Sequence, residues 1–247
     1  VHTDEFQNLK PGLAESWTQS SDGLEITMTL KSGVTFHSGD PLTADAVKFT
    51  FERFKEAGKA SPIYGGIMQI ASVDAVDDLT VVFRFRAPAA NFFSTIAMPY
   101  AGIIDPKSAQ VAEGAVINLE GTGPFALQEW KAGQSIALAR NEAYAWGPSN
   151  VANTAAPKVD KLLFKVIPDA TTQLNALKAG EVDVIFVNNP GHKRQLEADP
   201  NVEVHEAVIN SLVYLGSLPH QSVRLLCRLG QPWRKKFAKT QILEIAL

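Results

Sequence analysis

Apolar and polar residues alternate along residues 25–30, near the start of the chain. The apolar side chains are Ile26, Met28 and Leu30, two positions apart, which predicts a strand with one buried face. Residues 31–33 (KSG) predict a turn, and residues 34–37 (VTFH) predict a second short strand that ends at the turn SGDP. This stretch therefore predicts a strand pair that leads directly into the next element.

The hydrophobic spacing changes to a helical period after residue 42. Val47, Phe51 and Phe54 recur at positions i, i+4 and i+7, which places them on one face of a helix. Thr43 can accept hydrogen bonds from the first free backbone N–H groups, and Asp45 lies in the first turn, where a negative charge is favourable. A helix beginning at Thr43 is predicted.

The pattern along residues 9–115 predicts one compact α+β unit around these elements. Leu13 and Trp17 are core candidates, and residues 20–23 predict a hairpin connection. Residues 58–66 and 77–78 predict a loop and a turn. Three further strands are expected at residues 67–75, 80–85 and 102–104, and two helices at residues 89–97 and from Pro106.

The pattern along residues 116–216 predicts a second structural segment of the chain. Two glycines bracket Thr122 and precede Pro124, which suggests a backbone with unusual dihedral angles followed by a strand. A hairpin turn at residues 131–133 leads into residues 136–141. Strands are also predicted at residues 161–167, 181–186, 202–205 and 212–215, with helices beginning at residues 169 and 190.

The short links around the helix that begins at Asp169 predict a βαβ unit. Asp169 can cap that helix, Leu174 and Leu177 supply its apolar face, and Gly180 stands where a left-handed residue ends a helix. A strand, a helix and a strand joined in this way place the two strands side by side and parallel. A mixed sheet is therefore expected in this part of the chain.

Charge and cysteine content exclude several classes of protein. The 247 residues carry a net charge of −3, which does not favour nucleic-acid binding by the molecule as a whole. The single cysteine, Cys227, excludes an internal disulfide and a CxxC metal motif. Neither a long apolar run nor a signal peptide is evident, and the chain opens at Val1 without methionine, as a processed protein can.

Four motifs, in the same order, resemble one protein family. They are PGLAESW (residues 11–17), GVTFHSGDPLTADAV (33–47), GTGPF with RNEAYAW (121–125 and 140–146), and LKAGEVD (177–183). Together they resemble the family 5 extracytoplasmic solute-binding proteins, the peptide- and nickel-binding receptors of ABC importers. The resemblance covers residues 9–216 and implies a periplasmic-binding-protein-like lobe of type II, in the α/β (α+β) class.

The resemblance implies a binding protein and not an enzyme. The expected partners are a peptide or another small solute and the membrane permease subunits of an ABC transporter; no cofactor and no nucleic acid are expected. The location implied is periplasmic or extracytoplasmic. The candidate ligand contacts are the backbone of Gly121, Thr122 and Gly123 and the loop of Asn188 and Asn189, although these residues equally suit plain turns.

The resemblance stops near residue 216, and residues 217–247 form a basic tail. The family's second lobe is expected to be missing from this chain, so peptide binding should be weak or absent, and the exposed cleft face should favour aggregation or dimerisation. From Gln221 onward there are six basic residues and one acidic residue. The sequence suggests a frameshift after about Leu218, which sequencing of the coding DNA would test.

Other functions are less favoured by the residues. A hydrolase would need a motif such as GxSxG or HExxH, and neither is present. His37, Asp40 and Asp45 lack a second ligand pair at zinc-like spacing. The loop at residues 121–123 lacks the Lys-Ser/Thr of a phosphate-binding loop.

Aromatic residues raise two further questions. The basic tail contains an aromatic-basic patch at residues 233–237 (WRKKF), which leaves nucleic-acid or membrane-surface binding open as an alternative. Trp17 and Trp130 are expected in the core and not as platforms for a ligand.

Overall fold

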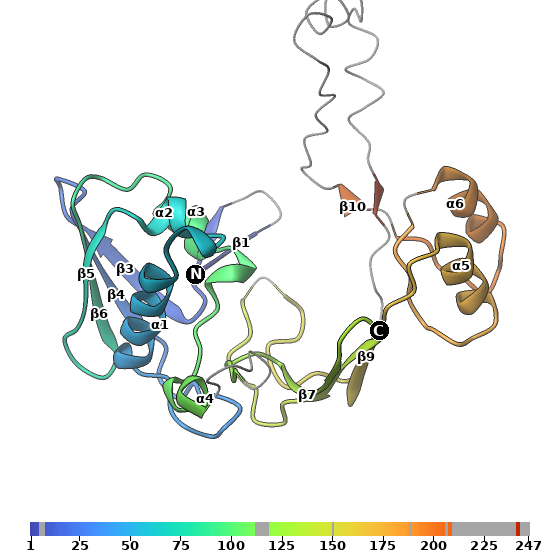
Figure 1. Ribbon diagram of the computed structural model, residues 1–247, viewed down its shortest axis with the longest axis horizontal. Helices are drawn as coiled ribbons and strands as arrows, with labels where there is room; N and C mark the ends of the chain where they lie inside the picture. Colours follow the sequence, from blue (N-terminus) through green and yellow to red (C-terminus); the bar gives the residue numbers. More distant parts are fainter. Residues whose placement is uncertain are drawn as a thin grey trace, which may run out of the picture. The chain divides into compact units, whose positions relative to one another are not determined.

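The structure is a computed structural model that describes residues 1–4, 8–111, 119–149, 151–187, 189–205, 207–208 and 241–242. The chain divides into two compact units, Val1–Lys165 and Val166–Leu247. Each unit is treated by itself below (Figure 1). The boundary at residue 165 follows from the contacts that residues make within each unit. The three segments 9–115, 116–216 and 217–247 expected from the sequence remain a prediction.

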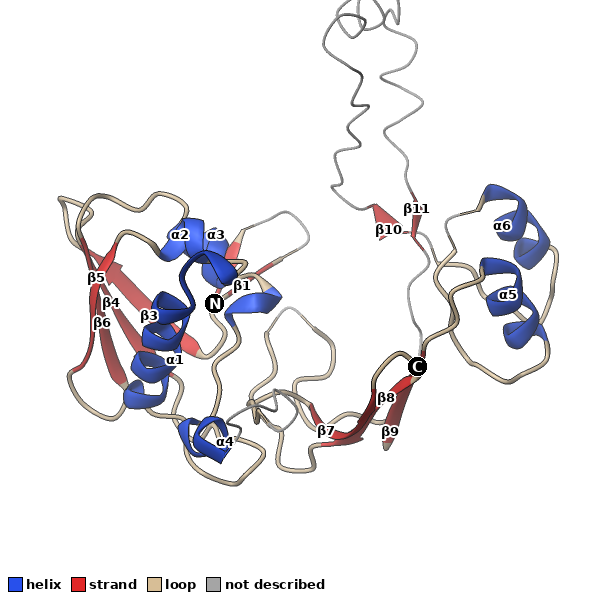
Figure 2. Ribbon diagram, viewed as in Figure 1, coloured by secondary structure: helices blue, strands red, loops and turns tan. Residues whose placement is uncertain are grey.

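A four-stranded antiparallel sheet forms the first part of unit 1. Its strands are β3 (Ala14–Gln19), β4 (Glu25–Leu30), β6 (Thr80–Phe85) and β5 (Ile70–Ala75), in the order β3-β4-β6-β5. Helix α1 (Ala44–Ala57) lies along one face of this sheet and packs on β5 and β6 (Figures 1 and 2). The α+β arrangement expected from the sequence pattern is confirmed.

The alternation in β4 has the predicted effect. Ile26, Met28 and Leu30 are all buried against α1 and its neighbours. The helix begins as expected, because the Oγ1 of Thr43 accepts a hydrogen bond from the amide of Ala46 and caps the first turn. Sequence spacing alone therefore located strand β4 and helix α1.

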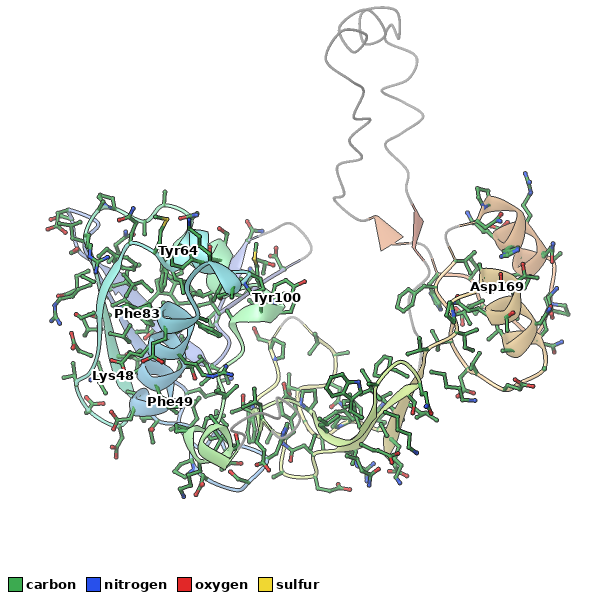
Figure 3. The ribbon with its side chains drawn as sticks, in the orientation of Figure 1. Lys48, Phe49, Tyr64, Phe83, Tyr100 and Asp169 are labelled. Atoms are coloured by element: carbon green, nitrogen blue, oxygen red, sulfur yellow. The ribbon has the colours of Figure 1, made fainter. Side chains whose placement is uncertain are left out.

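Aromatic side chains fill the space between the sheet and α1. The Phe83 ring lies 4.9 Å from that of Phe51 and 5.0 Å from that of Phe92, measured between ring centroids. Figure 3 labels Phe83 on the strand that α1 covers. Both Phe83 and Phe92 are almost completely buried. Edge-to-face and tilted pairs of this kind add to the stabilisation from burial alone.

Short elements complete this part of unit 1. The helices are α2 (Tyr64–Ile67), α3 (Phe92–Ile96) and α4 (Pro106–Val111), and the two single turns of 3-10 helix are η1 (Gly58–Ala60) and η2 (Pro99–Ala101). Strands β1 (His2–Thr3) and β2 (Leu9–Lys10) form a separate pair. The helices expected near residues 89–97 and from Pro106 are confirmed.

Three predictions in this region are wrong. Residues 34–37 form no strand, only a single bridge between Thr35 and Pro41, because the tight turn leaves room for one pair. Residues 102–104 are not a strand, since no neighbouring strand is available to them in the described residues. The strand expected from residue 67 begins at Ile70, and helix α2 occupies part of the predicted loop and extends to Ile67.

A three-stranded antiparallel sheet forms the second part of unit 1. Strands β7 (Phe125–Lys131), β8 (Ser135–Arg140) and β9 (Lys161–Lys165) lie in the order β7-β8-β9. Gly133 has a φ of 71°, as the turn between β7 and β8 requires. Trp130, Ile136 and Phe164 lie opposite one another in register, so they share one face of the sheet.

Two helices characterise unit 2. Helix α5 (Ala170–Lys178) and helix α6 (Pro190–Glu197) pack through a small core of Leu174, Ile185 and Leu196. Asp169 caps α5 as predicted, because its Oδ1 accepts from the amide of Thr172 at 2.7 Å. Unit 2 also contains β10 (Ala207–Val208) and β11 (Gln241–Ile242), which pair with each other.

The predicted βαβ unit is not formed among the described residues. Residues 181–186 and 202–205 form no strand there, and every described ladder is antiparallel. High β-propensity does not make a strand unless a neighbouring strand completes the hydrogen bonds. The strand predicted at residues 212–215 and nearly all of the basic tail lie outside the described residues.

The described helices were also tested as membrane spans. None of the helices in the described part of the chain is both long and apolar enough to cross a lipid bilayer.

Candidate functional site

The loop at residues 121–124 lies directly before strand β7. Its carbonyl groups are turned toward other parts of unit 1. The oxygen of Gly121 accepts from the backbone amide of His37 at 2.9 Å, and the oxygen of Thr122 accepts from the indole N–H of Trp146 at 2.8 Å. The first half of the loop is therefore held by two residues that are far away in sequence.

The second half of the loop is held in the same way. The oxygen of Gly123 accepts from the Nε2–H of His37 at 3.0 Å and from the side-chain amide of Asn141 at 3.1 Å. The backbone amide of Asn141 donates to the oxygen of Pro124 at 2.8 Å. A carbonyl oxygen can only accept, so the proton in the His37 contact lies on Nε2. Four consecutive carbonyls are thus bound, and we call this set of contacts the carbonyl clamp.

Local structure explains why His37 and Trp146 can reach the loop. His37 lies in the tight turn after Phe36, whose amide bonds to the oxygen of Asp40, and Gly39 takes a φ of 89° there. Trp146 packs its ring against the core of the four-stranded sheet and against Tyr144, at 5.1 Å between ring centroids. The clamp therefore connects the start of β7 to the core of the α+β part.

An ion pair lies beside the clamp. Lys107 and Asp40 approach to 2.7 Å, and hydrogen bonding and charge attraction from Asp40 raise the pKa of Lys107. The ammonium group of Lys107 is largely exposed, so water and salt screen this pair. The pair ties α4 to the 34–42 turn, but its contribution to stability is small.

The amide N–H groups of the loop differ from its carbonyls. Within the described residues, the backbone amides of Gly121, Thr122 and Gly123 donate to no protein acceptor. Thr122 is only 8% exposed. A donor without an acceptor in such a place is costly unless water or a ligand satisfies it. The loop can therefore offer hydrogen bonds to an oxygen atom of a ligand.

The glycines of this loop do not serve the purpose expected of them. The sequence suggested unusual dihedral angles, but neither Gly121 nor Gly123 has a positive φ. Cβ atoms added at these positions would meet only the oxygens of Ile103 and Phe125, each at an ordinary 3.8 Å. Neither strain nor packing within the described residues therefore requires glycine here.

The second predicted contact lies in unit 2. Asn189 caps α6, and its side-chain oxygen accepts from the amide of Gly191 at 2.7 Å. It lines a cavity of about 630 Å³ together with Phe186, His192 and residues of α5. Asn188 lies outside the described residues.

Hydrogen bonds from Thr172, with a smaller contribution from the charge of His192, lower the pKa of Asp169 at the start of α5 (Figure 3).

The two tryptophans singled out in the sequence differ. Trp17 packs on the main core, 5.5 Å from Phe93 between ring centroids, as expected. The prediction that Trp130 is a core residue is wrong, because its ring is 46% exposed on the three-stranded sheet. The described residues contain no group of three or more His, Cys, Asp and Glu side chains placed to hold a metal ion.

Sequence reasoning overlooked the residues of the clamp. The sequence pointed to His37 as a possible metal ligand and a motif residue, and to Asn141 and Trp146 as motif residues, but it did not indicate a shared contact. The available signal was that the donors and acceptors of this clamp all fall within two of the four family motifs: His37 in residues 33–47, the acceptors in residues 121–125, and Asn141 and Trp146 in residues 140–146. Residues that lie far apart in sequence and belong to motifs are natural candidates for one shared contact.

Comparison with solved structures establishes the class of fold. NikZ from Campylobacter jejuni in complex with Ni(L-His) superimposes with a TM-score of 0.72 at 27% sequence identity, covering 83% of this chain and 40% of that one. The oligopeptide-binding protein AppA from Bacillus subtilis in complex with a nonapeptide gives a TM-score of 0.70 at 30% identity, covering 84% and 41%. The chain has the fold of the type II periplasmic-binding proteins.

Sequence comparison then establishes the family. The profile described as "Bacterial extracellular solute-binding proteins, family 5 Middle" matches residues 8–225, which is most of the chain. The chain belongs to the family 5 bacterial extracellular solute-binding proteins, as the four motifs predicted. The match includes residues 217–225, the first part of the predicted basic tail.

Individual relatives show how much of the family's length this chain represents. Di/tripeptide-binding protein 1 of Pseudomonas aeruginosa is 33% identical over 228 residues, which are 83% of this chain and 41% of that relative. The dipeptide-binding protein of Escherichia coli is 31% identical over 219 residues, 79% and 39% of the two chains. The chain therefore spans about 40% of the length of the curated relatives that it matches.

Proposed function

We propose that this chain is part of the substrate-binding component of an ABC importer. Its solute is a peptide or a related small molecule bound outside the cytoplasm, and its protein partners are the permease subunits of the transporter. Membership of family 5 and relatives named for binding dipeptides, tripeptides and oligopeptides support this function. The proposal assigns binding to the chain and no catalytic step.

The observation that carries the proposal is the asymmetry of the loop at residues 121–123. The protein occupies the carbonyls of this loop, whereas its amides have no acceptor among the described residues. Peptides and chelating acids present carbonyl and carboxylate oxygens, which accept hydrogen bonds from such amides. The loop amides are therefore the proposed contact for a solute oxygen.

The two glycines support the same assignment. A residue without Cβ lets another group approach the backbone closely, and glycine is otherwise not needed here. A solute that bonds to the amides of Gly121 and Gly123 would pass through the space that a methyl group would fill. The Asn188–Asn189 loop stays a second proposed contact. Its support is that Asn189 lines a cavity in unit 2.

Alanine substitutions at the glycines test this function. Gly121→Ala and Gly123→Ala should leave the unfolding midpoint nearly unchanged, because an added Cβ meets only ordinary contacts. They should weaken the binding of dipeptides and tripeptides by about tenfold or more, since about 1.4 kcal/mol of lost contact has that effect. Saturation-transfer NMR is the suitable method, because it detects affinities of about millimolar strength.

A third glycine provides the matched control. Gly65 lies in α2, its added Cβ would meet nothing within 4 Å, and its φ is not positive. Gly65→Ala should therefore bind peptides as the unchanged chain does. Peptide binding that Gly121→Ala and Gly123→Ala both leave at the original strength would refute the loop as the contact.

A further inference from the structure

A cavity of about 220 Å³ lies within unit 1, between the four-stranded sheet, helix α1 and residues 96–103. Met28, Val81 and Phe83 line it from the sheet, and Phe51 lines it from α1. Met98 lines it from the opposite side. The cavity is separate from the carbonyl clamp and from the loop at residues 121–123, none of whose residues line it.

The lining chemistry indicates what the cavity can hold. The side chains that line it are apolar, and the lining also includes Val1, which carries the N-terminal amino group. The cavity is partly open to solvent, and an apolar occupant would remove the apolar side chains of its lining from water, which is favourable. An engineered protein cavity of about 150 Å³ with similar lining binds benzene. The cavity in unit 1 is larger and can hold one aromatic ring system.

The segment at residues 97–102 provides a route into the cavity. It forms one turn of 3-10 helix, η2, between α3 and an extended stretch, with few backbone bonds to the rest of the unit. Met98 is 47% exposed and Tyr100, labelled in Figure 3, is 63% exposed. Methionine is a flexible side chain that adapts to different occupants.

We propose that this cavity is a binding site for one apolar group of phenyl to indole size. Two sources share that chemistry: a free small aromatic molecule, and the aromatic side chain of a peptide. The proposal rests on the volume and lining of the cavity and is independent of the proposed contact at residues 121–123. It assigns a use to residues 96–103, which the family motifs do not include.

Two substitutions at lining residues of the 96–103 segment fill the cavity. Ala97 follows α3 in a helical conformation, so Ala97→Leu adds volume without backbone strain. Gly102 has a φ of −58°, and an added Cβ would meet only the oxygen of Pro99 at 3.8 Å, so Gly102→Leu is a second filling variant. The control is Ala139→Leu in β8, a half-buried alanine that does not line the cavity.

The experiment is a calorimetric and thermal-unfolding titration of the full chain with indole, with glycerol as a polar reference. Indole should bind saturably and raise the unfolding midpoint, whereas glycerol at the same concentration should not. Ala97→Leu and Gly102→Leu should each weaken indole binding by about tenfold or more, and Ala139→Leu should leave it unchanged. If one filling variant fails to fold, the other provides the same test.

The remaining outcomes separate the two sources or overturn the proposal. Displacement of indole by a phenylalanine-containing tripeptide, but not by trialanine, assigns the site to a peptide side chain. Indole binding that neither tripeptide displaces assigns it to a free aromatic molecule. The proposal is overturned if indole shows no saturable binding, or if both filling variants bind indole as the unchanged chain does. Neither result bears on peptide contact at residues 121–123.

Discussion

The two sheets of unit 1 have similar sequence patterns and different surroundings. In the four-stranded sheet, α1 packs on β5 and β6, and Ile26, Val81 and Phe83 are almost fully buried. In the three-stranded sheet, Trp130 and Phe164 are 46% and 47% exposed. Alternation therefore predicts which side chains share a face, but only a covering element makes that face a core.

The largest expected effect breaks the packed sheet. Phe83→Ala removes a buried ring that contacts Phe51 and Phe92, so it should lower the free energy of unfolding by about 3–5 kcal/mol. The matched variant is Phe164→Ala in the exposed sheet, where the change should stay below about 1 kcal/mol. Chemical denaturation measures both. Equal losses would show that the exposed face is covered in solution.

A second pair of variants compares two tryptophans. Trp146→Phe keeps an aromatic ring but removes the N–H that bonds to the oxygen of Thr122, so unfolding should become easier by about 1–2 kcal/mol. Trp130→Phe removes an N–H from an exposed ring and should change stability by less than about 0.5 kcal/mol. The same denaturation assay applies. If Trp146→Phe left the free energy of unfolding unchanged, the indole N–H would not contribute to the stability of the carbonyl clamp.

The third prediction concerns the helix that makes the packed sheet a core. Thr43→Ala removes the oxygen that caps α1, and should reduce stability by about 1 kcal/mol. Thr43→Ser keeps an oxygen in place and should restore most of that loss. Thermal unfolding followed by circular dichroism distinguishes the two variants. A full-sized loss in Thr43→Ser would mean that the methyl group of Thr43, and not its hydroxyl, stabilises the helix start.

The smallest expected effect is a pH dependence in the turn between β5 and β6. The Asp77 carboxylate accepts from the amides of Leu79 and Thr80, and these bonds lower its pKa. A lowered folded-state pKa means that the stabilisation is complete above the unfolded-state value of about 3.9 and is lost as the pH falls through the folded-state value. The stabilising contribution of this turn should therefore disappear only in acid.

Asp77→Asn tests that pH dependence directly. Between about pH 4 and pH 2, the unfolding midpoint of the variant should fall less steeply than that of the unchanged chain. Gln134→Met in the turn between β7 and β8 is the control, because residues 132–134 of this turn include no acidic residue that could lose charge in that range. Parallel acid profiles for Asp77→Asn and the unchanged chain would contradict the assignment.

The sequence predicted the packed sheet well because local signals and long-range packing agree there. The alternation of Ile26 and Met28, the cap at Thr43 and the β-branched run at residues 80–85 each point to the observed element. Helix α5 was also found from its cap residue and apolar spacing, and a helix was expected from Pro190, where α6 begins. The family motifs added the class of fold, which no local pattern could supply.

The failures have a common physical cause. Residues 34–37 and 202–205 have strand-like composition, but a strand exists only where a partner completes its ladder, and composition does not reveal the partner. The exposure of Trp130 depends in the same way on what covers its sheet. In the candidate site, the glycines were noticed, whereas the donors on His37 and Trp146 became visible only when the fold brought them to the loop.

The most direct test of the account is an amide-resolved NMR titration of the chain with a dipeptide. We expect the backbone N–H signals of Gly121, Thr122 and Gly123 to move progressively with dipeptide concentration. The indole N–H signal of Trp146 should stay in place, because it already bonds to the protein. Dipeptide-dependent shifts confined to other residues, with the amides of residues 121–123 unchanged, would contradict the claim that this loop contacts the solute.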